Sequence, residues 1–90
     1  MKLTIRRTAR LKRDMKGLLR GGKDIEKLLR AIEILAEGRT LPPEYKDHPL
    51  TGKYKGKRDC HIEPDWILIY GIEDHELVLY RTGSHSELFR

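Results

Sequence analysis

The apolar residues in the first half of the chain recur at helical spacing and predict two amphipathic helices. Thr8 and Asp24, residue types that cap helix N-termini, precede the two apolar runs. Gly21-Gly22 and Gly38 follow these runs and are typical of helix ends. The apolar positions are Leu11, Met15, Leu18 and Leu19 in the first helix, and Ile25, Leu28, Leu29, Ile32, Leu35 and Ala36 in the second.

Alternating polar and apolar residues predict strands on both sides of the helices. Residues 2–7 alternate in this way and predict a short strand. Residues 59–63 alternate again, with one apolar and one polar face. Residues 66–72 are apolar on both faces, as in a central strand, and residues 76–82 predict a further strand after a turn at residues 73–76.

A long irregular stretch, residues 39–57, separates the helices from the last three strands. Loops of this length inside compact domains are uncommon and are often functional. The order of strand, two helices, long loop and three antiparallel strands joined by hairpins predicts an α+β fold. Since only one side of each helix is apolar, both helices are expected on one face of the sheet. The other face is then expected to be concave and polar, in a single domain over residues 1–90.

Charge and cysteine content narrow the class of partner and the compartment. Lys and Arg number 19 against 14 Asp and Glu, for a net charge of +5, which favours a polyanionic partner such as nucleic acid or an acidic protein segment. The single cysteine, Cys60, excludes an intramolecular disulfide and fits a reducing compartment. No signal-peptide pattern or bilayer-length apolar run is found, so a cytoplasmic protein without a membrane partner is expected.

Three histidines and one aspartate lie where the loop and the predicted strands end: His48, His61, Asp65 and His85. Each alone is typical of a solvated surface residue. In an antiparallel sheet, however, the end of the strand that carries His61 and the chain after Thr82 can lie close together. Metal-free RNA cleavage needs such a set. One group takes the proton of the ribose 2′-hydroxyl, another protonates the 5′-oxygen, and a cation stabilises the phosphorane.

A metal site is the competing interpretation of the same residues. Two histidines and an aspartate can bind zinc, but no His-x-x-x-His on one helix and no cysteine pair supports it, so neither a metal nor another cofactor is expected. Lys53 and Lys55 flank Tyr54 in a basic cluster that leads along the chain to His61, which favours contact with RNA bases and phosphates. Cys60 is predicted in the core.

Four separated blocks of the chain resemble one known family. They are residues 47–52 (DHPLTG), 59–66 (DCHIEPDW), 68–70 (LIY) and 81–89 (RTGSHSELF). They make the chain similar to the RelE superfamily of toxins from bacterial toxin–antitoxin systems, specifically its YafQ-like branch. The resemblance covers nearly the whole chain and implies the small RelE-like α+β fold.

The resemblance also implies an activity. YafQ-like toxins are ribosome-dependent endoribonucleases (mRNA interferases) that enter the ribosomal A site and cut mRNA without a metal. By matching position, His85 would be the general acid that protonates the 5′-oxygen. His61 and Asp65, with help from His48, would activate the 2′-hydroxyl and hold the phosphate, and the resemblance leaves open which of the three is the base.

The resemblance extends to substrate contacts. Trp66 and Phe89 would position or stack the mRNA bases. Arg81 is expected to contact a phosphate because of its charge and placement. Lys53 and Lys55 are expected to contribute to the same RNA-binding surface.

The family implies partners as well. A cognate antitoxin would wrap the basic surface with an acidic C-terminal segment, and DNA would be contacted only indirectly, through the antitoxin. The ribosome, with its rRNA, and mRNA complete the expected set. One alternative is a non-catalytic module of the same fold that binds RNA or the antitoxin. A related toxin directed at DNA gyrase is disfavoured by the joint presence of His61, Asp65 and His85.

Overall fold

Both predicted helices form, and each begins at its predicted cap. The computed structural model describes residues 2–89, so the first and last residues of the predicted domain lie outside the described residues. Helix α1 spans Ala9–Arg20, and the Thr8 hydroxyl accepts a hydrogen bond from a first-turn backbone N–H. Helix α2 spans Ile25–Ala36, and the Asp24 carboxylate does the same. These side chains satisfy donors that have no partner inside the helix.

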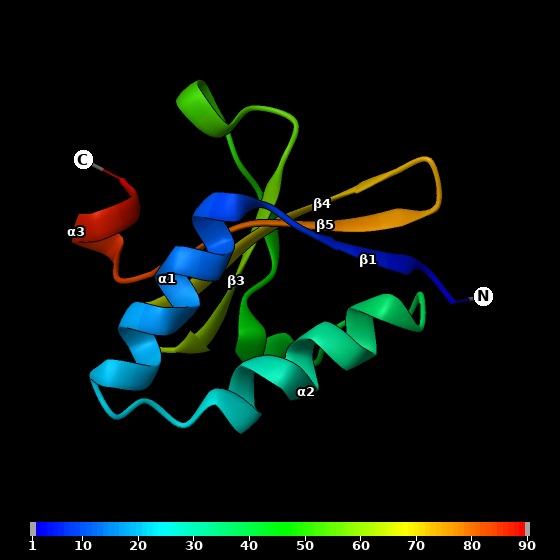
Figure 1. Cartoon of the computed structure of the whole chain (residues 1–90). Coiled ribbons are helices and arrows are strands. Elements are labelled where there is room, and N and C mark those ends of the chain that lie inside the picture. The colour runs from blue at the N-terminus through cyan, green and yellow to red at the C-terminus, as the bar shows by residue number, and fades with distance from the viewer. Residues whose placement is uncertain (1, 90) are drawn as a thin grey trace.

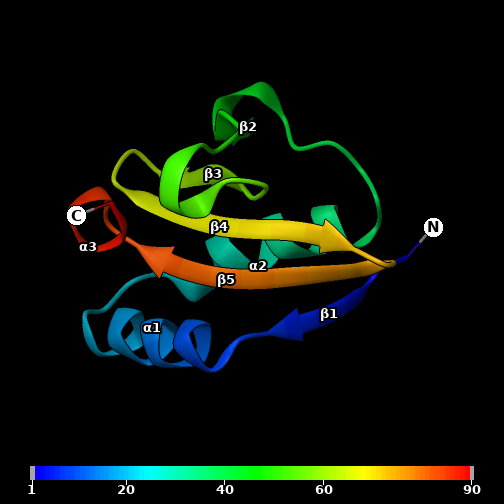
Figure 2. The same ribbon diagram turned by 90° about the horizontal axis from the view of Figure 1, so that it is seen from above.

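The sheet has five strands in the order β1-β5-β4-β3-β2, which Figure 2 shows from above. They are β1 (Thr4–Arg7), β2 (His48–Pro49), β3 (Arg58–Glu63), β4 (Trp66–Glu73) and β5 (Glu76–Gly83). As predicted, β3, β4 and β5 pair antiparallel. β1 pairs in parallel with β5, from Thr4 opposite Glu76 to Arg7 opposite Leu79. A parallel pair needs a crossover connection, and the segment that contains α1 and α2 supplies it.

Three features of the observed fold were not predicted. The parallel partner of β1 is one, and the two-residue strand β2, which pairs with β3, is too short to show alternation. The third is α3 (His85–Leu88), a single helical turn after β5. Two short 3₁₀ turns, η1 (Pro43–Tyr45) and η2 (Gly52–Tyr54), give order to the long loop.

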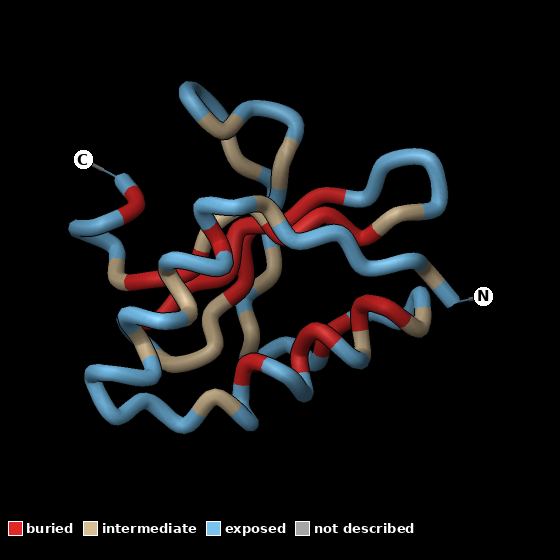
Figure 3. The backbone as a smooth tube through the Cα atoms, viewed as in Figure 1, coloured by how far each residue is buried: buried red, intermediate tan, exposed pale blue. Residues whose placement is uncertain are grey.

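One face of the sheet carries the main hydrophobic core. Helices α1 and α2 contribute to this core, together with the face of the sheet from which Cys60, Leu68 and Leu79 point (Figure 1). Figure 3 shows the buried segments running along β4, β5 and part of α2. The prediction that both helices pack on one face is confirmed. Cys60 is fully buried, as predicted, and burial raises the pKa of its thiol.

The expectation of an open, polar second face is wrong at one end of the sheet. Ile67, Ile69 and Leu88 form a second buried cluster there, and Leu50 and Tyr54 of the long loop pack against it. The physical reason lies in β4, which is apolar on both faces and therefore needs cover on both. The long loop and α3 provide that cover, and their edges carry the candidate site.

The β4–β5 hairpin closes through the predicted turn. Asp74 and His75 have φ angles of 47° and 64°, as the tight primed turn of a two-residue hairpin requires. Both side chains are exposed, so His75 lies at the surface, as predicted. Within the part of the chain that the structure describes, no helix has the length and apolar character needed to cross a membrane.

Candidate active site

His85 and Asp65 form a hydrogen-bonded pair between α3 and the β3–β4 turn. The backbone N–H of His85 donates to Asp65 Oδ1 at 2.9 Å, and the ring Nδ1 lies 2.8 Å from the same oxygen. These two hydrogen bonds, the backbone one first, hold the pKa of Asp65 below its usual range. Because the ionised carboxylate only accepts, Nδ1 must carry the proton, and Nε2 is left to exchange a proton with a ligand.

A capping box fixes the start of α3 and therefore the place of His85. The Ser84 hydroxyl accepts from the Glu87 backbone N–H, and the Glu87 carboxylate accepts from the Ser84 N–H at 2.9 Å. The preceding Gly83 leaves room for this carboxylate, since a Cβ at position 83 would lie 3.0 Å from Glu87 Oε1. The Ser-x-x-Glu spacing of residues 84–87 is the sequence signal that identifies this turn.

His61 and His48 continue the row of rings that His85 begins. The ring centroids of His61 and His85 are 5.4 Å apart, and those of His48 and His61 are 6.4 Å apart. The Nδ1 of His48 lies 2.8 Å from the carbonyl oxygen of Lys46, which can only accept, so this nitrogen also carries a proton. The structure thus brings together all four predicted acid–base residues, from the long loop, β3, the β3–β4 turn and α3.

Asp59 belongs to this group, although no role was predicted for it. It lies opposite His48 across the β2–β3 pair and is only 3% exposed. Its Oδ1 is 3.1 Å from His48 Nδ1 but accepts no hydrogen bond, because the proton of that nitrogen is directed to the nearer Lys46 carbonyl. Burial raises the pKa of Asp59, and the charges of His48, His61 and His85 act against that rise. The available signal was its position two residues before His61, on the same strand face.

The two aromatic residues of the predicted substrate surface differ in exposure. Phe89 is 40% exposed. Its ring centroid lies 6.1 Å from that of His85 and 5.7 Å from that of Tyr54, to which it is edge-on. Trp66 is only 1% exposed and belongs to the main core. The expectation that Trp66 stacks on a base is therefore corrected, because its faces are covered. Its indole N–H instead donates to Thr82 Oγ1 at 2.9 Å, which ties β4 to β5 below α3.

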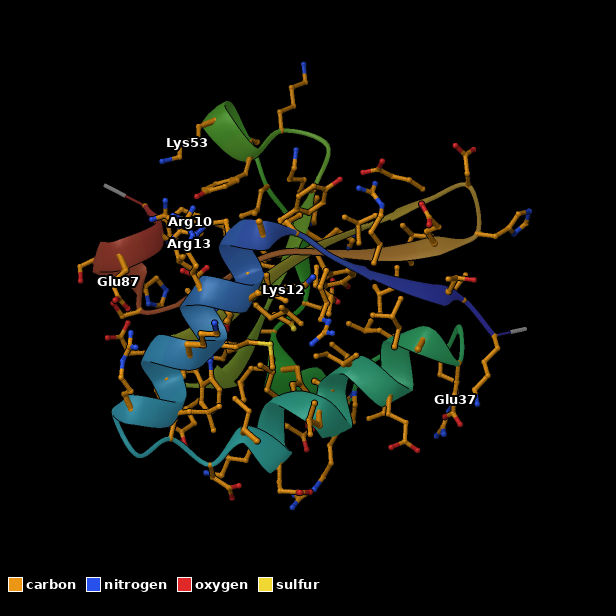
Figure 4. All side chains as sticks on the ribbon, in the orientation of Figure 1. Arg10, Lys12, Arg13, Glu37, Lys53 and Glu87 are labelled. Carbon is orange, nitrogen blue, oxygen red and sulfur yellow. The ribbon has the colours of Figure 1, made fainter. Side chains whose placement is uncertain are left out.

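The predicted basic contacts lie in two different settings. Arg81 forms a two-pronged pair with Asp14 of α1, at 3.0 and 3.1 Å, and its side chain is 17% exposed. That hydrogen bond raises the pKa of Arg81. Lys53 and Lys55 lie at the exposed η2 turn. Figure 4 shows Lys53 there, and the basic side chains Arg10 and Arg13 on α1.

An open cleft of about 490 Å³ lies beside His61. The cations in its lining are Lys27, Arg30 and Lys46. Glu63 also lines it, and hydrogen bonds from Lys23 and Lys27 lower the pKa of this carboxyl to about 2. Glu44 is a second carboxylate in the lining, so three cations face two carboxylates and the lining carries a small excess of positive charge.

No metal-ligand cluster is formed by the residues that the structure describes. Groups of three or more His, Cys, Asp or Glu side chains placed to hold an ion are absent from residues 2–89. The hydrogen bonds of the His48 and His85 rings to a carbonyl and a carboxylate suit proton transfer.

The family of the chain follows from its match over residues 3–90 to the model of the bacterial toxin of type II toxin–antitoxin systems, YafQ. The chain belongs to the YafQ family. This membership confirms the resemblance that the four sequence blocks suggested. It also makes the histidine row a feature of a toxin of the YafQ family rather than of an unrelated protein with a similar sheet.

Several relatives of the YafQ family share both the sequence and the fold. The mRNA interferase toxin YafQ of Escherichia coli strain K12 is 47% identical over 78 residues, which are 86% of this chain and 85% of that protein. A chain of the E. coli DinJ–YafQ toxin–antitoxin complex matches at a TM-score of 0.92 and 42% identity, with 100% of each chain covered. A metal-bound toxin from Helicobacter pylori matches at a TM-score of 0.91 and 44% identity, covering 97% of this chain and 99% of that one. These likenesses confirm the predicted fold and the predicted class of enzyme, an endoribonuclease toxin.

Proposed function

We propose that this chain cuts mRNA in the ribosomal A site by metal-free general acid–base catalysis and so inhibits translation. The observation that carries the proposal is the His85–Asp65 pair, joined at 2.8 Å, with the His61 ring 5.4 Å from His85. The His85 ring is hydrogen-bonded to the Asp65 carboxylate through Nδ1, and the His61 ring lies opposite the His85 ring. The family supports the substrate, since the E. coli relative is named an mRNA interferase.

His85 suits the role of general acid. Its Nδ1 proton is held by Asp65, so the proton on Nε2 of the imidazolium is the one that can be delivered. In the proposed reaction the 2′-oxygen attacks phosphorus, the bond from phosphorus to the 5′-oxygen breaks, and that oxygen takes the His85 proton. The products are a 2′,3′-cyclic phosphate and a 5′-hydroxyl end.

His48 and His61 are the remaining candidates for the base that takes the 2′-hydroxyl proton. Asp65 is a weaker candidate because two hydrogen bonds from His85 occupy its Oδ1 and lower its pKa. His48 donates through Nδ1 to the Lys46 carbonyl, which leaves the lone pair of Nε2 free to accept a proton. Histidine suits both roles since its ordinary pKa is about 6.5.

The exposed groups around the row of rings suit binding of an RNA chain. Phe89 offers a partly exposed ring beside His85 for stacking on a base. Lys53 of η2, Lys55 directly after it, and the lysine and arginine side chains that line the cleft beside His61 suit contact with phosphates. Arg81 is paired with Asp14 and so ties β5 to α1 below the site.

The same basic surface suits an antitoxin. The E. coli relative has been solved in complex with the antitoxin DinJ, and we propose that this chain is likewise neutralised by a cognate antitoxin. An acidic antitoxin segment and ribosomal RNA are both anionic and match the net charge of +5. Contact with DNA is then expected only through the antitoxin.

The test is toe-printing of a defined mRNA on translating ribosomes with the wild-type protein and His85→Ala. Loss of a general acid is expected to slow cleavage by about 10²- to 10⁴-fold. The matched control is His75→Ala, which removes an exposed histidine at the β4–β5 hairpin and is expected to leave cleavage unchanged. Wild-type cleavage at A-site codons, lost only in His85→Ala, is the expected result.

Two results would contradict the proposal. Cleavage by His85→Ala at the wild-type rate would remove His85 from the reaction. Absence of cleavage by the wild-type protein would favour the alternative of a non-catalytic module that binds RNA or its antitoxin.

A further inference from the structure

The buried carboxylate of Asp59 has no structural explanation in the fold around it. Its side chain is 4% exposed, and Oδ1 is the buried side-chain oxygen that lacks a hydrogen bond among residues 2–89. A buried carboxylate without such partners is costly to keep in a fold. The same strand position would accept an apolar residue, because its cross-strand partner is Ile69.

The charged groups that face Asp59 come from three elements of the site and from the loop before it. His48 of β2 lies 3.1 Å away, and His61 of β3 and His85 of α3 also interact with its charge. Asp47, which precedes β2, acts in the opposite direction and is itself tied to Arg58 and Tyr70. The carboxylate is therefore surrounded mainly by the groups of the proposed acid–base site.

The contacts of His48 show what the carboxylate can do. Nδ1 of this ring faces two acceptors, the Lys46 carbonyl at 2.8 Å and Asp59 Oδ1 at 3.1 Å. Both disfavour the tautomer that lacks a proton on Nδ1. When Nε2 takes a proton from a substrate, the imidazolium that forms lies against a negative charge with little solvent to screen it.

We propose that Asp59 is a positioning residue, which keeps the Nδ1 proton on His48 and stabilises the imidazolium that forms when His48 accepts the 2′-hydroxyl proton. This inference rests on the proposed ribonuclease function and assigns to it a residue beneath the row of rings. It also assigns the base, since the tautomer favoured by both the Lys46 carbonyl and the Asp59 carboxylate leaves Nε2 of His48 to take the proton.

The folding of an Asp59 variant separates this role from a structural one. The pKa of Asp59 is higher in the folded protein than in an unfolded chain, so ionisation of this group opposes folding at neutral pH. Asp59→Asn removes that cost. We expect it to fold with a thermal midpoint equal to or above that of the wild type, and to cleave about 10- to 100-fold more slowly, a typical loss for a supporting residue.

The experiment compares the wild type with Asp59→Asn and Asp74→Asn, a control that makes the same change at the exposed hairpin turn. Histidine ring signals are followed by NMR against pH in the free proteins, and cleavage of ribosome-bound mRNA is measured across the same range. In Asp59→Asn the titration midpoint of His48 and the acid limb of the cleavage profile should both move to lower pH, because a nearby negative charge is lost. Asp74→Asn should move neither.

The outcomes are distinguishable from those of the proposed function. If the wild type cleaves but His48 titrates alike in both proteins, or if Asp59→Asn is unfolded, the role of Asp59 is wrong while the ribonuclease function stands. If the wild type fails to cleave, the proposed function falls, and with it the catalytic role of Asp59. The NMR titration then decides only whether the two side chains are coupled.

Discussion

Two histidine–carboxylate pairs lie at opposite ends of the row of rings, and they differ in burial. The His85 and Asp65 side chains are 51% and 69% exposed, and two hydrogen bonds hold the pKa of Asp65 below its usual range. In the other pair, His48 is equally exposed at 51%, but Asp59 is 4% exposed and burial raises its pKa. The histidine lowers the pKa of the carboxyl in both pairs, and burial reverses the net direction at Asp59.

The comparison teaches that hydrogen bonds and desolvation can each dominate within one small site. Asp65 is stabilised as an anion by donors that point at it, and solvent screens what remains. Asp59 keeps its charge at a cost to folding, and the histidines above it offset part of that cost. Asp65, the partner of the proposed acid His85, stays ionised. Asp59, the partner of His48, responds to the protonation of that ring. The two carboxylates therefore suit the two ends of a proton-transfer reaction.

The largest expected effect comes from breaking the exposed pair. Asp65→Asn removes the negative charge beside the His85 ring and leaves only a neutral amide oxygen as acceptor for its ring and backbone, so cleavage should slow by about 10- to 100-fold. Because the pKa of Asp65 is lowered on folding, its stabilising effect is present above the ordinary carboxyl pKa of about 3.9 and is lost as the pH falls further. The thermal midpoint at neutral pH should therefore be equal to or below that of the wild type, whereas that of Asp59→Asn should be equal to or above it. Equal shifts of the thermal midpoint, with the same sign, in Asp65→Asn and Asp59→Asn would contradict the difference between the two histidine–carboxylate pairs.

The next largest effect is expected from the contacts of Asp14, which lie beneath the His85–Asp65 pair. Asp14→Ala leaves the Arg81 guanidinium and the Thr82 N–H without the carboxylate that accepts from both. The pair is mostly buried, so the free energy of unfolding should fall by about 2 kcal/mol in denaturant titration. Lys12→Ala, a charge change on the exposed side of α1, is the control and should leave the unfolding curve unchanged. A similar loss in both variants would show that α1 itself, and not the Asp14 contacts, is sensitive.

A smaller effect is expected from one glycine of the β5–α3 junction. Gly83→Ala places a Cβ 3.0 Å from Glu87 Oε1 and disturbs the capping box, which should cost about 1 kcal/mol of unfolding free energy and slow cleavage a few-fold. Gly17→Ala is the matched control, since it lies inside α1 with nothing within 4 Å of the added Cβ. There alanine should stabilise by about 0.5–1 kcal/mol. Two changes of the same sign would contradict the role given to Gly83.

The smallest effect should come from an exposed pair outside the row of rings. Glu63→Gln breaks the contacts with Lys23 and Lys27, which lie at 2.9 and 2.8 Å but in solvent. Exposed ion pairs stabilise little, so the unfolding midpoint at neutral pH should stay within error of the wild type. Any contribution should vanish as the pH falls from the ordinary carboxyl range toward about 2, the pKa of Glu63. A clear midpoint change at neutral pH, measured by thermal unfolding, would show that exposed pairs matter more here than solvent screening allows.

Local sequence signals accounted for much of the fold. The caps at Thr8 and Asp24 and the apolar periodicity located α1 and α2 because these features act within one turn of helix. The parallel pairing of β1 with β5 was not predicted, since it joins residues 4–7 to residues 76–79 and no local pattern encodes that distance. The single turn of α3 was missed although Ser84 and Glu87 carry its capping signal.

For the site, as for the fold, the sequence predicted some features correctly and missed others. His48, His61, Asp65 and His85 were identified from residue type and family resemblance, and the structure brings them together. Two residues lie in environments that differ from the predicted ones. The family resemblance implied that Trp66 positions or stacks the mRNA bases, but this first residue of β4 lies in the core. Alternation predicts Asp59 on a polar strand face, but the pairing of β3 with β2 places it beside the long loop, where it is buried.

The parallel pairing of β1 with β5 has a consequence for the synthesis of the protein. Thr4–Arg7 are made before their strand partner and can pair only when residues 76–79 have been made. His85 follows that partner directly, so the strand that completes the sheet and the residue assigned to proton delivery arrive together. A growing chain that lacks them has neither the edge of its sheet nor the His85–Asp65 pair. The topology thereby ties the assembly of a catalyst aimed at translation to a late stage of its own translation.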